Sequence, residues 1–134
     1  MHRMSDIIQF ETRGRMAIIT LNRPEARNAV NGEFALGLEA AIDRFEADDD
    51  LWVGILAANT EGQSNPVFSA GADLKVTGSG KGGPITTERG WFAGFVYRER
   101  TKPIIAAVDG LATAGGCEIV LACDIIVATT RSAF

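Results

Sequence analysis

The chain has 134 residues, of which 46% are hydrophobic and 22% are charged, and its formal net charge is −4. This length suits one domain with a real core, and the composition is ordinary for a soluble globular protein. The acidic balance without a Lys/Arg cluster argues against a nucleic-acid partner, and no apolar run reaches the roughly 20 residues of a membrane span.

The N-terminal segment, residues 1–10, lacks the apolar stretch of a signal peptide, which predicts a cytoplasmic protein. His2 is the single histidine, so neither a histidine triad nor a histidine metal site is expected. Cys117 and Cys123 fit no disulfide or metal spacing and are expected to be buried, reduced thiols. The acidic run at 48–50 is interpreted as a solvated turn, so no metal site is predicted.

The first half of the chain predicts a hairpin, a helix and a strand. Two β-prone runs, 7–12 and 16–21, flank Gly14 and indicate a hairpin. Asn31 is expected to cap a helix whose apolar face recurs at spacings of three and four. The residues of that face are Phe34, Leu38, Ala41, Ile42 and Phe45. The run 51–57 is apolar without alternation, which predicts a strand covered on both faces.

The middle of the chain is rich in glycine. Residues 67–69 are predicted to be extended and to lead into 70–72, where alanine, glycine and alanine permit close backbone approach to a ligand. Residues 76–84 predict a mobile loop, either a lid or a substrate-shaped segment. A phosphate-binding loop is disfavoured there because the order G-x-x-x-x-G-K-[ST] is absent. A helix is predicted over 88–100.

The last part, residues 104–128, predicts two buried strands joined by a short helix. The strands are 104–108 and 125–128, and the helix begins at Gly115 with Glu118 in its first turn. Bare backbone N–H groups at a helix start, beside a carboxylate, are the parts of an oxyanion site with an acid/base group. The element order as a whole predicts an α/β chain of repeated strand–strand–helix units.

Three motifs in this order resemble the crotonase (enoyl-CoA hydratase/isomerase) family. They are IITLNRP at 18–24 with RNA at 27–29, FSAGADLK at 68–75, and KPIIAAVDG at 102–110 followed by AGGCE at 114–118. The resemblance implies an α/β crotonase (ClpP-like) spiral of repeated ββα units, truncated after its first turns. Residues 1–134 would form the N-terminal part of a single crotonase-like domain, without the C-terminal half and its trimerisation helices.

The resemblance also implies a site. An acyl-CoA thioester would be the substrate, with no separate cofactor. By position, the backbone N–H groups of Ala72 and Gly115 would hold the thioester oxygen, and Glu118 would act as acid/base on water. The CoA moiety would contact Ala26, Arg27, Ala70, Asp73, Leu74 and Lys75.

The chain departs from the family pattern at two places. The second acid of the hydratases would lie beyond Phe134, and Ala114 stands where the family more often has glycine, which we expect to be a mild change. The leading hypothesis is an enoyl-CoA hydratase that adds water to a 2-enoyl-CoA and that forms a trimer or hexamer when full length. The alternatives are an enoyl-CoA isomerase and a non-catalytic acyl-CoA-binding or assembly fragment.

Overall fold

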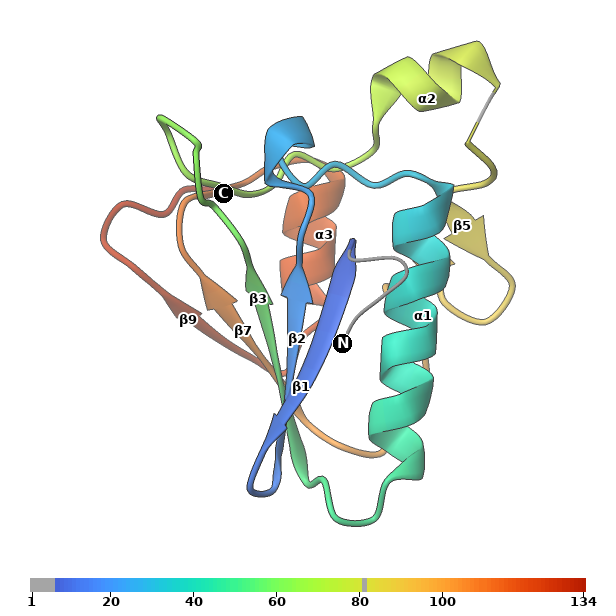
Figure 1. The fold of residues 1–134 in the computed structure, drawn as a ribbon, viewed down its shortest axis with the longest axis vertical. Coiled ribbons are helices and arrows are strands. Elements are labelled where there is room, and N and C mark those ends of the chain that lie inside the picture. Colours follow the sequence, from blue (N-terminus) through green and yellow to red (C-terminus); the bar gives the residue numbers. More distant parts are fainter. Residues whose placement is uncertain (1–6, 81) are drawn as a thin grey trace.

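A five-stranded sheet forms the centre of the protein, as the computed structural model shows (Figure 1). The structure describes residues 7–80 and 82–134, so the interpretations of His2 and of the N-terminal segment before residue 7 lie outside the described residues. The strand order is β1-β2-β3-β7-β9, with β1 antiparallel to β2 and every other pair parallel. The strands are β1 Ile8–Arg13, β2 Met16–Leu21, β3 Val53–Ala58, β7 Ile104–Val108 and β9 Ile125–Ala128.

Smaller elements surround this sheet. Two short strand pairs form, β4 Val67–Ser69 with β8 Leu111–Ala112 and β5 Thr86–Thr87 with β6 Trp91–Phe92. The helices are the 3₁₀ turn η1 Pro24–Ala26, α1 Gly32–Ala47, α2 Leu74–Ser79 and α3 Gly115–Leu121. The arrangement is α/β, as the sequence predicts.

The first helix forms for the reasons visible in the sequence. The Asn31 side chain accepts a hydrogen bond of 2.8 Å from the backbone N–H of Phe34, which satisfies one orphan donor of the first turn. The predicted apolar face of α1 is buried along its whole length. The predictions of the cap, the helix and its buried face are therefore confirmed.

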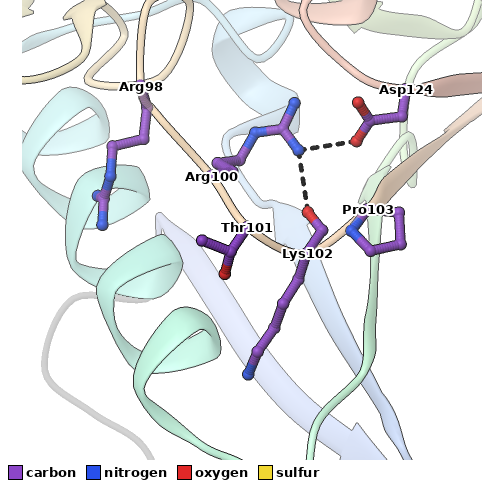
Figure 2. A pocket seen from close by; sticks show the side chains of 6 residues that line it. All are labelled: Arg98, Arg100, Thr101, Lys102, Pro103 and Asp124. Atoms are coloured by element: carbon purple, nitrogen blue, oxygen red, sulfur yellow. Dashed lines mark hydrogen bonds and ion pairs between the residues drawn. The ribbon is translucent and has the colours of Figure 1, made fainter.

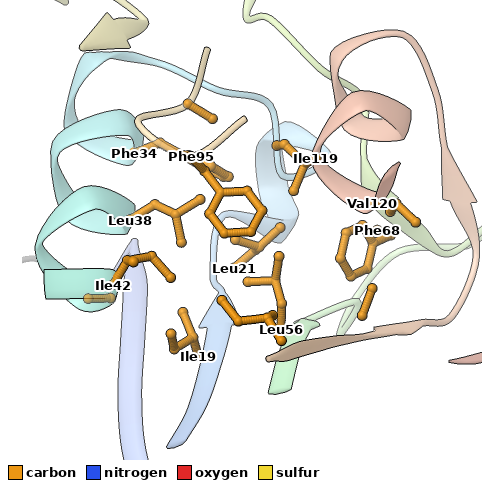
Figure 3. Close-up of a cluster of buried hydrophobic side chains, with 14 of the residues drawn as sticks. Ile19, Leu21, Phe34, Leu38, Ile42, Leu56, Phe68, Phe95, Ile119 and Val120 are labelled. Atoms are coloured by element: carbon orange, nitrogen blue, oxygen red, sulfur yellow. The ribbon is translucent and has the colours of Figure 1, made fainter. Parts of the chain in front are cut away.

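The core lies between the helices and one face of the sheet (Figure 3). Leu38 of α1 and Ile119 of α3 approach it from two sides, and Leu21 and Leu56 project from the sheet between them. All four side chains are fully buried. Burial of each such side chain stabilises the fold by about 1.5–3 kcal/mol, so this face holds α1 and α3 in place above the sheet.

The segment 88–100 is not a helix, so that prediction is wrong. The structure has the β5–β6 hairpin followed by turns. Trp91 and Ala93 adopt left-handed backbone angles, with φ of 58° and 59°, and Gly94 follows with 66°. These angles are incompatible with a right-handed helix. The turns that replace the helix leave Phe95 buried in the core.

The glycine-rich segment is a helix where it begins. Helix α2 includes the first four residues of the predicted loop 76–84, so the loop prediction is wrong there. The cause is Asp73, whose Oδ1 accepts the backbone N–H groups of Lys75 at 3.1 Å and Val76 at 3.4 Å. An aspartate in this position favours a helix start. Beyond α2, Gly82 and Gly83 have positive φ and continue as irregular backbone.

The apolar strands are less covered than the sequence predicts. Alternate residues of β3 and β7 are only half-buried. Strand β9 pairs with β7 alone in the described part of the chain, and Ile125, Ile126 and Val127 are 54%, 42% and 60% exposed. The strand positions are correct, but the expected cover on both faces is wrong because, within the described residues, the helices bury one face only.

Both cysteines are free thiols, as the sequence predicts, but they are only partly buried, so the expected burial is wrong. Burial raises the pKa of the Cys123 thiol to about 12, which keeps that thiol neutral at physiological pH. None of the helices in the described ranges is long and apolar enough to cross a membrane. Among the same residues, no three His, Cys, Asp or Glu side chains gather as a metal site would require.

Candidate active site

The predicted site residues gather at one edge of the sheet. Strands β2, β3 and β7 are parallel, so their carboxyl ends meet there, at the top of Figure 1. The turn η1 follows β2, and α3 begins at this edge after β7 and β8. Ligands of open α/β sheets bind outside the carboxyl ends of the strands. The topology therefore places both glycine turns in the region where a ligand site is expected.

Backbone hydrogen bonds join the segment 27–30 to the segment 69–73. The bonds run from Ala70 N–H to Arg27 O at 3.0 Å, from Val30 N–H to Gly71 O at 2.8 Å, and from Asp73 N–H to Val30 O at 2.9 Å. A further bond of 3.1 Å, from Thr113 N–H to Ser69 O, joins the same segment to the approach of α3. Three separate stretches of the chain are thus fixed to one another by their main chains.

The two glycine turns are in direct contact. Gly71 has a φ of +85°, and a Cβ added to it would lie 2.7 Å from the backbone nitrogen of Gly115. A Cβ added to Gly116 would collide with the carbonyl oxygen of Ser69. No side chain fits between these backbones, so the close approach found here is that of one turn to the other. Approach of a ligand to them stays a prediction.

Two backbone donors are free beside this contact. In the described part of the chain, no acceptor is bonded to the N–H of Ala72 or to that of Gly115. The N–H of Gly116, in contrast, donates to Thr113 O at 2.8 Å. A pair of unbonded donors on adjoining segments is the arrangement that stabilises a developing oxyanion. The binding of a thioester oxygen by these groups stays a prediction.

Ala114 is not the mild change that we expected. It precedes α3 with φ of 51° and ψ of −121°, a combination that an L-residue rarely adopts. Such backbone costs about 1–3 kcal/mol and persists only where the surroundings enforce it. The strain immediately precedes the free N–H of Gly115, and glycine would relieve it.

Glu118 lies in the first turn of α3, three residues after Gly115, which puts the two residues on one side of the helix. Its side chain is exposed and has no hydrogen-bond or ionic partner among residues 7–80 and 82–134. Its catalytic role stays a prediction.

The residues predicted to contact CoA lie at the same edge but differ in exposure. Arg27 and Lys75 are exposed, and Leu74 is 79% exposed at the start of α2. Ala26 and Ala70 are half-buried. Two cations and one apolar side chain are thus available to a ligand there.

Asp73 differs from the other predicted CoA contacts because its carboxylate is already bonded within the protein. Its Oδ2 pairs with Nη1 of Arg23 at 2.7 Å, and the two side chains are only 11% and 15% exposed. The same Arg23 nitrogen donates to the carbonyl of Ala29 at 2.9 Å. The side chain of Asp73 thus holds the start of α2 against the loop after β2, and its backbone N–H donates to Val30 O at 2.9 Å. Contact of Asp73 with a ligand stays a prediction.

Asn28 and Ser69 support the site, although neither was predicted to have a role in it. The fully buried Asn28 side chain accepts the N–H of Arg23 at 2.7 Å and donates to two carbonyls, those of Asn59 and Val67. The Ser69 hydroxyl donates to Asn28 O at 2.8 Å and accepts the N–H of Gly71 at 3.2 Å. Ser69 has a signal in the sequence, since it is polar among apolar and small residues, whereas Asn28 ends the polar stretch 22–28 and has none.

The Arg23–Asp73 pair predicts a dependence of stability on pH. The Arg23 guanidinium, hydrogen-bonded to Asp73, holds the pKa of that carboxyl below its usual range. The stabilisation is therefore present above about pH 4, the unfolded value, and is lost as pH falls through the folded pKa. We expect Asp73→Asn to lower the free energy of unfolding by about 3 kcal/mol at pH 7 and to flatten its decline in acid. Urea unfolding between pH 3 and pH 7 measures both effects.

The control for this prediction is Asp50→Asn. Asp50 pairs with Arg15 at 3.2 Å, but its side chain is 86% exposed, so its loss should leave the unfolding free energy nearly unchanged. The free energy of unfolding of Asp73→Asn should decline less steeply in acid than that of the unaltered protein. An equally steep decline would contradict the assignment of this pH dependence to the Arg23–Asp73 pair.

A polar cavity of about 550 Å³ lies at the opposite edge of the sheet, where β7 begins (Figure 2). Its cations already have structural partners. Arg100 donates to the carbonyl of Ala122 at the end of α3 and pairs with Asp124 at 2.8 Å. Lys102 donates to two carbonyls at the end of α1, those of Phe45 at 2.9 Å and Asp48 at 2.7 Å. Arg100 and Lys102 thus satisfy helix ends, which gives these two cations a structural role.

The fold and the paired glycine turns define a class of protein. A sequence model of the enoyl-CoA hydratase/isomerase family matches residues 11–134, and the chain belongs to this family. The resemblance to crotonases is therefore confirmed.

Particular relatives are found among solved structures and curated proteins. A probable enoyl-CoA hydratase/isomerase from Mycobacterium abscessus is 46% identical, with a TM-score of 0.80 over 93% of this chain and 46% of that one. The carnitinyl-CoA hydratase from Mycobacterium avium is 35% identical, with a TM-score of 0.85 over 96% and 48%. A probable enoyl-CoA hydratase from Rhizobium meliloti is 38% identical over 92% of this chain and 46% of its own length. The fold is thus the crotonase fold, and the chain spans about half the length of these relatives.

Proposed function

We propose that this chain carries the oxyanion site of an enoyl-CoA hydratase, which adds water across the 2,3 double bond of a 2-enoyl-CoA. The observation that supports this most is the pair of unbonded N–H groups, of Ala72 and Gly115, on two glycine turns in contact. Family membership and relatives named as hydratases support the same reaction.

The chemistry needs such donors. When the oxygen of water attacks C3, the electron pair of the double bond moves to C2 and onto the thioester oxygen, which becomes an enolate. Two fixed N–H donors stabilise that charge without reorganising, and loss of one such donor typically costs about 3 kcal/mol of transition-state energy. A proton delivered to C2 then completes the hydration.

Glu118 is the acid/base group of the proposal. Its carboxylate is exposed and unpartnered within the described ranges, so it is available to accept a proton from the attacking water. Its position on the same side of α3 as Gly115 supports a role for this acid beside the proposed enolate. A family isomerase would rely on a different acid, which makes hydration the preferred reaction.

The CoA moiety is proposed to lie along η1 and α2. The exposed cations Arg27 and Lys75 suit its phosphates through charge-assisted hydrogen bonds, and the exposed Leu74 suits its apolar portion. No cofactor beyond the thioester substrate is required. We also propose that the full-length protein acts in the cytoplasm and that it forms a homotrimer or hexamer. Light scattering would test the oligomeric state.

Crotonyl-CoA tests the function directly. We expect the absorbance of the conjugated thioester to decay when the substrate is added to the protein, either the 134 residues or a longer natural polypeptide that contains them. Calorimetric titration with butyryl-CoA, which cannot be hydrated, measures binding separately. Binding with turnover supports the hydratase, whereas the absence of both contradicts the proposal.

The second candidate is a non-catalytic acyl-CoA-binding or assembly unit. Two observations favour it, namely that the chain spans about half the length of its relatives and that Glu118 has no partner among the described residues. Binding of butyryl-CoA without turnover of crotonyl-CoA, in both forms of the protein, would select this candidate.

A further inference from the structure

The ring of Phe92 lies against the proposed oxyanion donor. A Cβ added to Gly115 would be 2.5 Å from Cζ and 2.6 Å from Cε2 of Phe92. With standard bond lengths, this places the edge of the ring within about 5.5 Å of the Gly115 nitrogen. The ring is half-buried and packs against the core, so part of it remains exposed.

The backbone around Phe92 is held in an unusual conformation. Its two neighbours, Trp91 and Ala93, both have left-handed angles although neither is glycine. Hydrogen bonds enforce this shape, from Ala93 N–H to Ile85 O at 2.8 Å and from Gly94 N–H to Trp91 O at 3.0 Å. Strained backbone of this kind persists where the surroundings over-determine it and is concentrated at functional sites. Here its effect is to direct Phe92 at Gly115.

The hairpin that carries Phe92 is also anchored from outside. Arg89 forms two hydrogen bonds, of 2.8 and 2.9 Å, with the carboxylate of Asp43 on α1. A Cβ added to Gly94 would lie 2.5 Å from the carbonyl oxygen of Ala35, also on α1. The hairpin that carries the ring is therefore fixed to α1 and is not a free loop.

We propose that Phe92 determines which acyl groups the site accepts, by closing the space beside the Gly115 N–H to a branch at C2. This rests on the proposed function. An oxygen held by that N–H lies about 2.7–3.1 Å from the nitrogen, so the first acyl carbons come within reach of the ring. An unbranched chain passes the ring edge, whereas a methyl group on C2 meets it.

Binding of two isomeric thioesters tests the proposal. Butyryl-CoA and isobutyryl-CoA have the same number of carbons and differ only by the branch at C2. We expect the unaltered protein to bind butyryl-CoA more tightly by tenfold or more, in the range that one misplaced methyl group gives. Phe92→Ala should reduce this preference at least fivefold, and Phe92→Leu should give an intermediate value. Calorimetry measures the dissociation constants, and crotonyl-CoA against its 2-methyl derivative gives the corresponding ratio of kcat/KM.

Trp91→Ala is the matched control, since Trp91 precedes Phe92 on the same hairpin but is 55% exposed. The Trp91→Ala protein should prefer butyryl-CoA over isobutyryl-CoA by the same factor as the unaltered protein. An unchanged preference in Phe92→Ala, with butyryl-CoA still bound, overturns the role of Phe92 and leaves the proposed function intact. If the unaltered protein binds neither thioester, the proposed function fails and this inference with it. Should Phe92→Ala not fold, Phe92→Leu provides the same comparison.

Discussion

Replacing Gly71 with alanine is expected to lower the turnover of crotonyl-CoA by about 100-fold or more, the effect of losing an oxyanion donor. The new methyl group would lie 2.7 Å from the nitrogen of Gly115, a separation that real Cβ atoms do not tolerate. Relief of this clash must separate the two glycine turns, and their separation displaces the N–H groups of Ala72 and Gly115 from each other. Because Gly71 also has a φ of +85°, alanine there adds backbone strain to the clash.

Gly62→Ala separates these two causes. Gly62 has a similar φ of +79°, but a Cβ there would meet nothing within 4 Å. This variant therefore has the left-handed strain without the clash, and it should lose about 1 kcal/mol of stability and no activity. Urea unfolding and steady-state hydration of both variants make the comparison. Full turnover by a folded Gly71→Ala protein would show that the contact between the turns does not position the donors.

Glu118→Gln is expected to lower kcat by a factor of about 10² to 10⁴, the usual contribution of a general acid/base group. Glutamine preserves the size of the side chain but cannot accept the proton of the attacking water. The free energy of unfolding should not change, because the side chain is exposed and has no partner within residues 7–80 and 82–134. Binding of butyryl-CoA should not change either.

Glu33→Gln is the control, because Glu33 is likewise an exposed glutamate in the first turn of a helix, α1. It should hydrate crotonyl-CoA at the unaltered rate. A Glu118→Gln protein that also retains its full rate would remove Glu118 from the mechanism and leave the two N–H donors as the whole of the site.

Local signals in the sequence were sufficient for the first helix and for most strands. Asn31 and the spacing of apolar residues predict α1 correctly, and the run 104–108 coincides with β7. The same reasoning fails at 88–100, because Gly94 is fixed by its approach to the carbonyl of Ala35 on another element. Contacts between distant segments override local spacing there.

The site was predictable in its parts but not in its assembly. Each glycine turn is visible in the sequence, yet the contact of Gly71 with Gly115 depends on how β4 and β8 pair. The pairing of the two donors came from the resemblance to the family. The role of Phe92 could not be predicted, because its ring reaches Gly115 only through the β5–β6 hairpin.

The bonds between the segments 27–30 and 69–73 join main-chain atoms, which affects how amino-acid substitutions change the site. The proposed chemistry uses main-chain amides, which every residue type except proline supplies. The proposed wall around the acyl group, in contrast, comes from a side chain on a separate hairpin. Substitution of side chains around the acyl group can therefore change which thioesters the site accepts, while the two backbone N–H donors stay in place. The same reaction can in this way act on different thioesters in one fold.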